Sequence, residues 1–304
     1  MSDFRRRLMM VKRMQEPPNY LALVALANGT FTFTIGESVT LSDLAYVEYS
    51  TDEGETWVKT DNVASTAVTI TTPTITQGNR VLWRGSGTRT ARGTSSGSYS
   101  NFSATCNHNV EGHVCSLLYG SAKNQYDTIS ANYTFVGLFY GDTKLISSEG
   151  LVLPSNATQY CYNRFFRDCT NHSVTFAEIK APTLYAYSMN NMYYNNSVLE
   201  RSPDILSNTA TGNYVCGNCF QNCKKLKYIK CLFTSRSSTT GQTWVASVAS
   251  SGIFVKHINA TWSVSGNNGV PSGWTIINYN PSTGKYYLED KTTECDDHGN
   301  VINN

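Results

Sequence analysis

The chain has 304 residues, a formal net charge of +2 and only 15% charged residues. This weak charge balance argues against specific nucleic-acid binding, because phosphate contacts need a concentrated basic face. No apolar run approaches the roughly 18 residues that span a bilayer, so no membrane span is expected. Thr, Ser, Asn, Gly and Tyr are abundant and long amphipathic helical patterns are rare, which favours a mainly β fold with some α.

Residues 1–19 form a basic leader that ends at Pro17-Pro18. Its apolar residues are spaced by i, i+4 and i+7, which predicts a short helix with one apolar stripe. We expect this stripe and the arginines beside it to dock on a protein partner, although a frayed terminus is the alternative. The docking residues are Phe4, Arg5, Arg6, Arg7, Leu8 and Val11.

The segment LALVALA, residues 21–27, imitates the apolar core of an export signal, and Ala25-Leu26-Ala27 imitates its cleavage site. The apolar run is short, and Glu16-Pro17-Pro18-Asn19 separates it from the basic leader. We therefore do not expect it to act as an export signal.

Residues 20–105 alternate on a two-residue period. FTFTI, for example, places Phe31, Phe33 and Ile35 on one face of a strand. Several short strands separated by Gly, Asn and Asp predict a β-sandwich-like domain, to which we assign attachment.

One hairpin in this domain, YSTDEGETW, carries the S-x-D-x-G-x-T-W pattern called an Asp box in sialidases and other carbohydrate-active β-propellers. Ser50, Asp52 and Gly54 are turn formers, whereas Trp57 favours a strand. We expect Asp52 to accept hydrogen bonds from its own loop and Trp57 to pack into the domain. Because the pattern occurs once, without propeller repeats, a carbohydrate-active enzyme is only a remote alternative, and no catalytic residues are assigned.

Residues 106–234 contain a repeat of 27 residues. The matched columns are Tyr133, Tyr160, Tyr187 and Tyr214; Phe139, Phe166, Tyr193 and Phe220; Asp142, Cys169, Asn196 and Cys223; and Leu145, His172, Leu199 and Leu226. This period lies in the range of leucine-rich repeats, so a leucine-rich-repeat solenoid is predicted.

The columns predict how the coils stack. One repeat cannot bury its own apolar face, so Phe166 needs Phe139 and Tyr193 above and below it. The column that begins with Asp142 should hydrogen-bond turn backbone or pack a small thiol. After Cys231 the register is lost, and residues 235–304 are expected to form a C-terminal cap and tail.

Ligand binding is expected on the aromatic segment YAYSMNNMYYNN, residues 185–196. It mixes tyrosine with asparagine, residue types that stack on sugar rings and hydrogen-bond hydroxyl groups. Tyr187 and Tyr193 belong to the repeat columns and are interpreted as core. Tyr185, Tyr194 and Asn195 are the candidate ligand-binding residues.

The cysteines and histidines offer weak candidates for a metal site. Two groups have suitable ligands: Cys106, His108, His113 and Cys115; and Cys216, Cys219, Cys223 and Cys231. For the nine cysteines the expectation is buried free thiols that act as small apolar side chains. No cofactor is therefore assigned.

The segment LVLPSNATQYCYNRFFRDCTN resembles a BspA-type leucine-rich repeat in its spacing of Leu-Pro, Tyr, Phe-Phe and Cys. GQTWVASVASSGIFVK and GVPSGWTI resemble the terminal element of such proteins in gut Bacteroidales and their crAss-like phages. MSDFRRRLMM, EYSTDEGETW and VEGHVCSLLYG are similar to segments of the same group, so the resemblance covers most of the chain.

The resemblance implies a non-enzymatic virion protein of a phage, such as a head fibre, a tail fibre or a capsid decoration subunit. Its partners would be capsid or tail proteins and a glycan or protein on the host surface. Elongated subunits with one docking end often assemble around an axis, so a dimer or trimer is expected. The alternative is a BspA-like adhesin on the bacterial cell surface.

Overall fold

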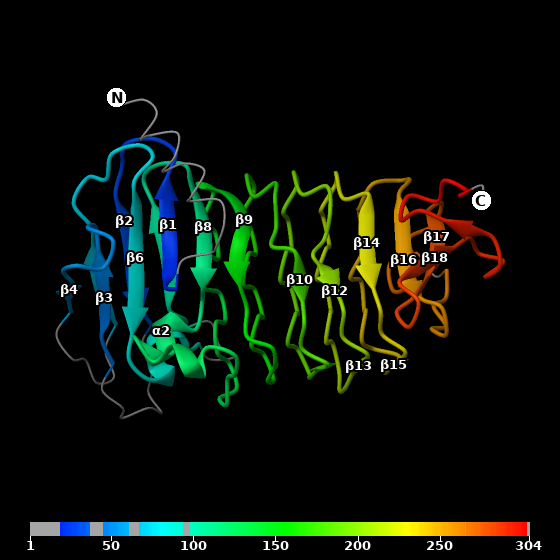
Figure 1. The fold of residues 1–304 in the computed structure, drawn as a ribbon, viewed down its shortest axis with the longest axis horizontal. Helices are drawn as coiled ribbons and strands as arrows, with labels where there is room; N and C mark the ends of the chain where they lie inside the picture. The colour runs from blue at the N-terminus through cyan, green and yellow to red at the C-terminus, as the bar shows by residue number, and fades with distance from the viewer. Residues whose placement is uncertain (1–18, 37–44, 61–66, 94–97, 265, 303–304) are drawn as a thin grey trace.

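The computed structural model describes residues 19–36, 45–60, 67–93, 98–264 and 266–302. This part of the chain is mainly β, as the sequence predicts, and is elongated along one axis (Figure 1). Helical structure within it is confined to α2 (Ser116–Tyr119) and the 3-10 segments η1 (Thr88–Ala91) and η2 (Lys123–Gln125). The expected docking residues of the leader lie outside the described residues.

The N-terminal part contains two sheets. The larger has the order β4 (Val58–Lys59), β3 (Val47–Ser50), β6 (Arg80–Gly85), β1 (Leu21–Ala25), β8 (His108–His113) and β9 (Leu145–Val152), and the smaller has the order β5 (Val68–Thr71), β2 (Phe31–Ile35) and β7 (Asn101–Ala104). Aromatic side chains of the two sheets pack against one another. The ring centroids of Phe33 and Phe102 in the smaller sheet are 4.4 Å apart. The ring of Trp83 in the larger sheet is 6.2 Å from that of Phe33 and 5.2 Å from that of Phe102.

The segment that imitates an export signal forms the central strand β1. This strand pairs antiparallel with β6 on one side and with β8 on the other. Leu21, Leu23 and Ala25 are fully buried. Cleavage after Ala27 would therefore remove the middle of the larger sheet.

Strand pairing and the hydrophobic core both continue across residues 105 and 106, where the sequence analysis places a domain boundary. β8 is antiparallel to β1 and parallel to β9, which belongs to the first repeat. Phe102 of β7 stacks on Phe139 of that repeat, with 5.4 Å between ring centroids. The N-terminal sheets and the repeats thus share one core.

The C-terminal half is a β-solenoid whose coils stack along the long axis (Figure 1). One face is a sheet in the order β10 (Glu178–Ile179), β12 (Asp204–Ile205), β14 (Tyr228–Cys231), β16 (Ile253–His257), β17 (Thr275–Asn280), β18 (Lys285–Tyr287) and β19 (Glu294–Cys295). A second face is a sheet of β11 (Thr183–Leu184), β13 (Thr209–Ala210) and β15 (Ser235–Arg236). The coil strands pair in parallel, which confirms the predicted solenoid.

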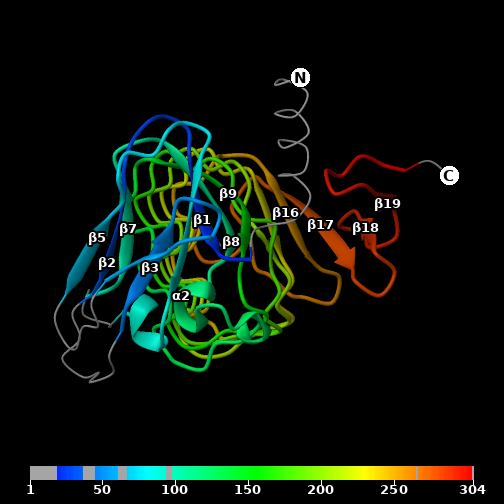
Figure 2. The same ribbon diagram turned by 60° about the vertical axis from the view of Figure 1, so that its left-hand side comes forward.

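The third side of the coils is a run of β-turns, here called the turn ribbon: residues 133–142, 160–169, 187–196, 214–223 and 239–247. Within a coil, the amide of Asn196 donates to the carbonyl of Tyr193 at 3.0 Å. Between coils, the amide of Tyr193 donates to the carbonyl of Cys219 at 2.9 Å. Each coil therefore satisfies the backbone of its neighbour, and Figure 2 shows the coils stacked one behind another.

Many turns in the ribbon hold their third residue at positive φ, as in a type II turn. These residues include Gly137, Gly141, Arg164, Asp168, Asn191, Asn195, Asn218, Asn222 and Thr243. Gly and Asn tolerate this left-handed conformation best. Much of the asparagine in the repeats is therefore explained by turn geometry.

The stacked rings in the core form an aromatic spine, composed of Phe102, Phe139, Phe166, Tyr193 and Phe220. All five are fully buried, and successive ring centroids are 5.4, 5.5, 5.4 and 5.6 Å apart. Phe166 lies between Phe139 and Tyr193, as the sequence predicts. Such offset contacts add to the free energy gained by burying the rings.

The column that begins with Asp142 bonds to backbone in successive coils. Asp142 accepts hydrogen bonds from the amides of Lys144 and Leu145 at 2.9 and 3.2 Å. The thiol of Cys169 donates to the carbonyl of Phe139 at 2.8 Å, and two periods later the thiol of Cys223 donates in the same way to the carbonyl of Tyr193. These contacts match the turn-bonding role predicted for this column.

His172 occupies the apolar leucine column as a neutral imidazole. Its ring is fully buried beside Phe166, and its Nε2 lies 2.9 Å from the hydroxyl of Ser148. The side-chain amide of Asn196 is oriented so that its nitrogen donates to two backbone carbonyls. The oxygen of the same amide then accepts a hydrogen bond from His172 Nδ1 at 3.2 Å. Burial lowers the pKa of His172 to about 3, so the imidazole carries no charge at neutral pH.

The 27-residue register is lost after Cys231, as predicted, but the solenoid continues for another coil. The amide of Phe220 donates to the carbonyl of Trp244, 24 residues later, whereas Tyr193 donates to Cys219, 26 residues later. This coil is therefore two residues shorter, which hides the repeat. The parallel sheet continues through β16 and β17, and only β18 and β19 pair antiparallel.

Replacing Phe166 by Ala should lower the free energy of unfolding by about 3–5 kcal/mol, because it opens a cavity in the middle of the spine. Chemical denaturation, monitored by circular dichroism, measures this free energy of unfolding. Tyr185→Ala, at a side chain 40% exposed, is the control and should change it by less than about 0.5 kcal/mol. Similar effects of the two variants would contradict the stacking role.

Acidification should destabilise the protein through His172. The unfolded imidazole binds a proton below about pH 6.5 and the folded one only near pH 3, so stability falls as pH falls through this window. Between pH 6.5 and 4.5 the loss should be about 2–3 kcal/mol. Denaturation of His172→Leu, which restores the leucine of the other coils, should show a shallower pH slope; an unchanged slope would refute this assignment.

Candidate functional site

The exposed side of the turn ribbon carries a row of stacked tyrosines. This tyrosine column consists of Tyr133, Tyr160, Tyr187 and Tyr214, all half-buried. Successive ring centroids are 4.5, 4.7 and 5.3 Å apart, with interplanar angles of 17°, 4° and 25°. Each ring covers the face of the next, so the column presents ring edges and hydroxyl groups along the solenoid axis.

These tyrosines sit in an unfavourable backbone conformation. Their φ angles are 62°, 61°, 58° and 53°, in the left-handed region that bulky residues rarely adopt. Such positions typically cost about 1–3 kcal/mol each, and they gather at functional sites. The same turns accept Asn elsewhere in the ribbon, so turn geometry alone does not require tyrosine. The column is therefore our first candidate for ligand contact.

A second row on the ribbon combines tyrosine with arginine. The Arg167 guanidinium lies 4.5 Å from the ring centre of Tyr194 and 5.8 Å from that of Tyr140. Its Nε is 3.3 Å from Oδ2 of Asp168, and Oδ1 of Asp168 accepts a hydrogen bond from the side-chain amide of Asn195 at 3.0 Å. Side chains of neighbouring coils thus hold one another in place at the surface.

The structure distributes the predicted ligand-binding residues over this surface. Tyr185 is 40% exposed, while Tyr194 and Asn195 are half-buried in the second row. Tyr193 is fully buried, as the core interpretation predicts, but Tyr187 is half-buried in the tyrosine column. The sequence shows the 27-residue period of both columns, but the period alone does not reveal which column faces solvent.

Asp52 of the Asp-box hairpin is held within its own loop. Its carboxylate accepts hydrogen bonds from the hydroxyl of Ser50 at 2.7 Å and from the amide and hydroxyl of Thr56. These bonds, chiefly that from the Thr56 hydroxyl, lower the pKa of Asp52 to about 2. Gly54 has φ +94°, and the indole of Trp57 donates to its carbonyl at 3.1 Å.

Trp57 packs between two elements of the N-terminal part. Its ring meets Tyr20 edge-on at 5.1 Å, and the guanidinium of Arg84 covers it at 3.8 Å. The hairpin thus closes the edge of the larger sheet.

The structure separates the first group of candidate metal ligands. His108 and His113 are five residues apart on β8, so they point to opposite faces of the sheet. His108 is fully buried with its Nε2 3.4 Å from Asp142, while His113 packs against Tyr126. Burial lowers the pKa of His108 and raises that of Asp142. This pair lies inside the junction between the N-terminal sheets and the first coil.

All nine cysteines are buried and free. Those of the second candidate group pack in the solenoid core, where burial raises the pKa of each thiol: Cys216, Cys219, Cys223 and Cys231. Their positions are explained by core packing.

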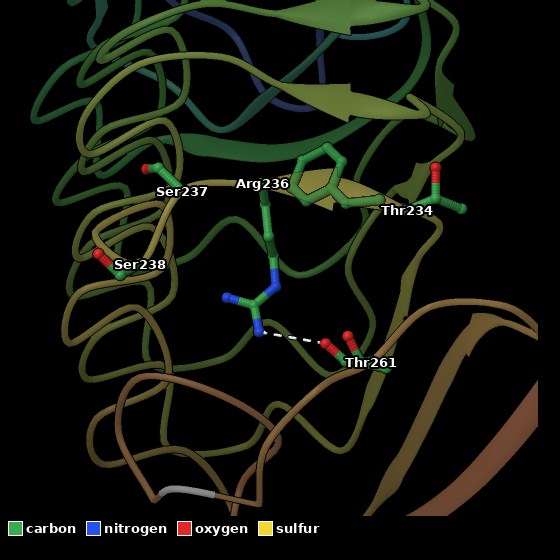
Figure 3. A pocket seen from close by; sticks show the side chains of 6 residues that line it. Thr234, Arg236, Ser237, Ser238 and Thr261 are labelled. Carbon is green, nitrogen blue, oxygen red and sulfur yellow. Dashed lines mark hydrogen bonds between the residues drawn. The ribbon is translucent and has the colours of Figure 1, made fainter.

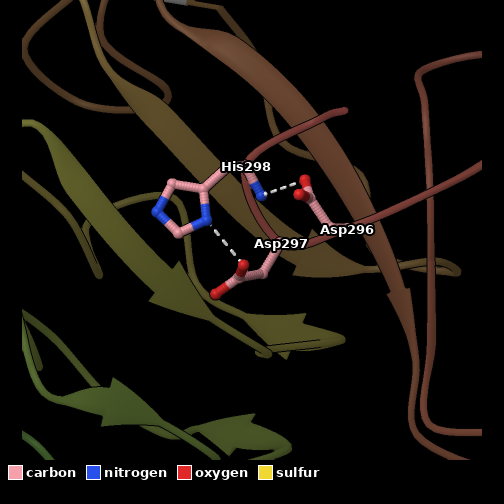
Figure 4. A group of neighbouring side chains, drawn as sticks. All are labelled: Asp296, Asp297 and His298. Atoms are coloured by element: carbon pink, nitrogen blue, oxygen red, sulfur yellow. Dashed lines mark hydrogen bonds and ion pairs between the residues drawn. The ribbon is translucent and has the colours of Figure 1, made fainter. Parts of the chain in front are cut away.

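Among the described residues, one group of side chains has metal-binding atoms within 4.8 Å of one another: Asp296, Asp297 and His298. Figure 4 shows these side chains on the loop that follows β19. Asp296 accepts bonds from the amides of His298 and Asn300 at 2.9 and 2.8 Å, and His298 lies 2.6 Å from Asp297. Turn formation accounts for these contacts.

No helix in the described part of the chain is long and apolar enough to cross a membrane. Comparisons of the chain with protein-family models, with curated proteins and with solved structures found no match.

Proposed function

We propose that this chain is a non-enzymatic phage virion protein that binds a polysaccharide of the host surface through its turn ribbon. In this proposal the N-terminal sheets form a β-sandwich-like attachment domain, which docks on capsid or tail proteins together with the basic leader. The coils are a leucine-rich-repeat solenoid of BspA type that projects from the particle. A head fibre, a tail fibre and a capsid decoration subunit all fit this arrangement.

The tyrosine column is the observation that carries the binding proposal. Because the ring faces cover one another, a ligand would meet a row of phenol hydroxyl groups with nearly regular spacing. Tyrosine hydroxyl groups are protonated at neutral pH and can therefore donate hydrogen bonds. An extended polysaccharide offers repeating hydroxyl groups that can pair with such a row. Tyr185, two residues before Tyr187 in the chain, adds an exposed aromatic ring.

The contacts of the Asp-box hairpin support a non-catalytic role. The Asp52 carboxylate is occupied by its own loop. The nearby Arg80 pairs with Glu53 and Glu111, and Arg84 pairs with Glu48. Sialidase chemistry would need arginines that are free to receive a substrate carboxylate.

Assembly on a particle is supported by the resemblance and by the fold of β1. Export of the cleaved chain would remove a central strand, whereas virion assembly leaves it in place. Mass spectrometry of purified phage particles should therefore detect the chain with residues 21–27 intact. Absence from particles, together with labelling at the bacterial surface, would favour the adhesin alternative instead.

Changing Tyr160 and Tyr187 together to Asn should weaken polysaccharide binding by about tenfold or more while the fold is kept. Asn tolerates the left-handed backbone, so only the rings and hydroxyl groups are lost. A polysaccharide microarray identifies a bound glycan, and surface plasmon resonance then compares the variants on it.

The matched control is Tyr287→Asn on β18, which removes a tyrosine away from the turn ribbon. It should bind as the unchanged protein does. Absence of binding to every polysaccharide, or an equal loss in both variants, would overturn the proposal.

A further inference from the structure

An arginine ends one of the apolar columns of the solenoid. On the sheet of β11, β13 and β15, Leu184 pairs with Ala210 and Ala210 pairs with Arg236. Leu184 and Ala210 are buried in the core, 0% and 3% exposed. The same inward-facing position in the next coil thus holds a guanidinium group.

Arg236 has few partners for its charge. Its guanidinium lies 4.2 Å from the ring centre of Trp262, and Nη2 donates to the carbonyl of Thr261 at 3.4 Å. Within the described residues no carboxylate lies within ion-pair distance of it, whereas Arg80 has two such partners and Arg201 has one. Burial lowers the pKa of Arg236. The guanidinium therefore keeps unused donors in a partly desolvated place.

These donors face a pocket of about 220 Å³. Its lining is Phe233, Thr234, Arg236, Ser237, Ser238 and Thr261. Figure 3 shows the guanidinium extending between Ser237 and Ser238 on one side and Thr234 and Thr261 on the other. A cation surrounded by hydroxyl groups, above an indole ring, suits a small ligand that is both anionic and rich in hydroxyl groups.

The pocket adjoins the end of the tyrosine column. The hydroxyl of Ser237 donates to the carbonyl of Gly212 at 2.9 Å, and that of Thr239 donates to the side chain of Asn213 at 3.0 Å. Gly212 and Asn213 directly precede Tyr214, the last member of the column. A chain ligand that follows the tyrosines toward the C-terminal end therefore reaches this pocket.

We propose that the Arg236 pocket binds the carboxylate of an acidic sugar residue, a uronic acid, within the polysaccharide. The planar guanidinium can donate two parallel hydrogen bonds to a carboxylate, and the serine and threonine hydroxyl groups can bind the sugar hydroxyls. The inference rests on the proposed function in one respect: the same ligand contacts both the tyrosine column and the Arg236 pocket. A pocket of this kind would give the turn ribbon a preference for acidic polysaccharides. It would also fix the direction in which the polysaccharide lies along the solenoid.

The test compares tetragalacturonate with its methyl ester, which has the same sugar backbone without the charge. Isothermal titration calorimetry of the full chain should show at least tenfold tighter binding of the acid form. Arg236→Met keeps an apolar side chain over Trp262 but should abolish this preference. Arg201→Met is the matched control, because Arg201 also covers an aromatic ring, that of Tyr228, and should leave the preference unchanged.

Equal binding of the two oligosaccharides, binding of neither, or a preference that survives in Arg236→Met would overturn the inference. An equal, Arg236-dependent affinity for a polyglutamate peptide would also overturn it, since the partner would then be a protein. The proposed function fails separately. If acid binding depends on Arg236 but not on Tyr160 and Tyr187, the pocket stands and the ribbon proposal falls.

Discussion

Parallel hydrogen bonding between coils is the constraint on which the structure depends. It sets the separation of successive backbones at about 4.8 Å, the spacing of strands in a sheet. Aromatic rings attached at equivalent positions are then held 4.5 to 5.6 Å apart, close to a stacking distance. The buried spine and the surface tyrosine column are thus two results of one backbone repeat. A change in coil spacing would disturb both together.

The same constraint explains what the sequence could predict. Equivalent positions in stacked coils have the same environment, so Phe166 and its neighbours recur with the period of the coils. The solenoid and the bonding role of the Asp142 column could therefore be inferred from spacing. The coil that carries Trp244 was missed because it is two residues shorter, although its turns still stack. The continuity between β8 and β9 was missed because parallel pairing joins segments that share no sequence pattern.

The candidate site was harder to predict because it depends on which way each column faces. Tyr187 and Tyr193 have the same residue type and the same period, yet one lies half-buried at the surface and the other is fully buried in the core. Arg236 gives no signal in the sequence at all. Its ring partner Trp262 comes from the next coil, and the apolar column it ends is visible only in the register of short strands.

Hairpins close both ends of the stacked sheets. The Asp-box hairpin leaves β4, only two residues long, as the outer strand at the N-terminal end. At the C-terminal end, β18 and β19 fold back antiparallel over β17. Short edge strands, such as the two-residue β4 and β19, are poor templates for adding another chain. Within the described residues, the length of the turn ribbon is therefore set by the number of coils in one chain.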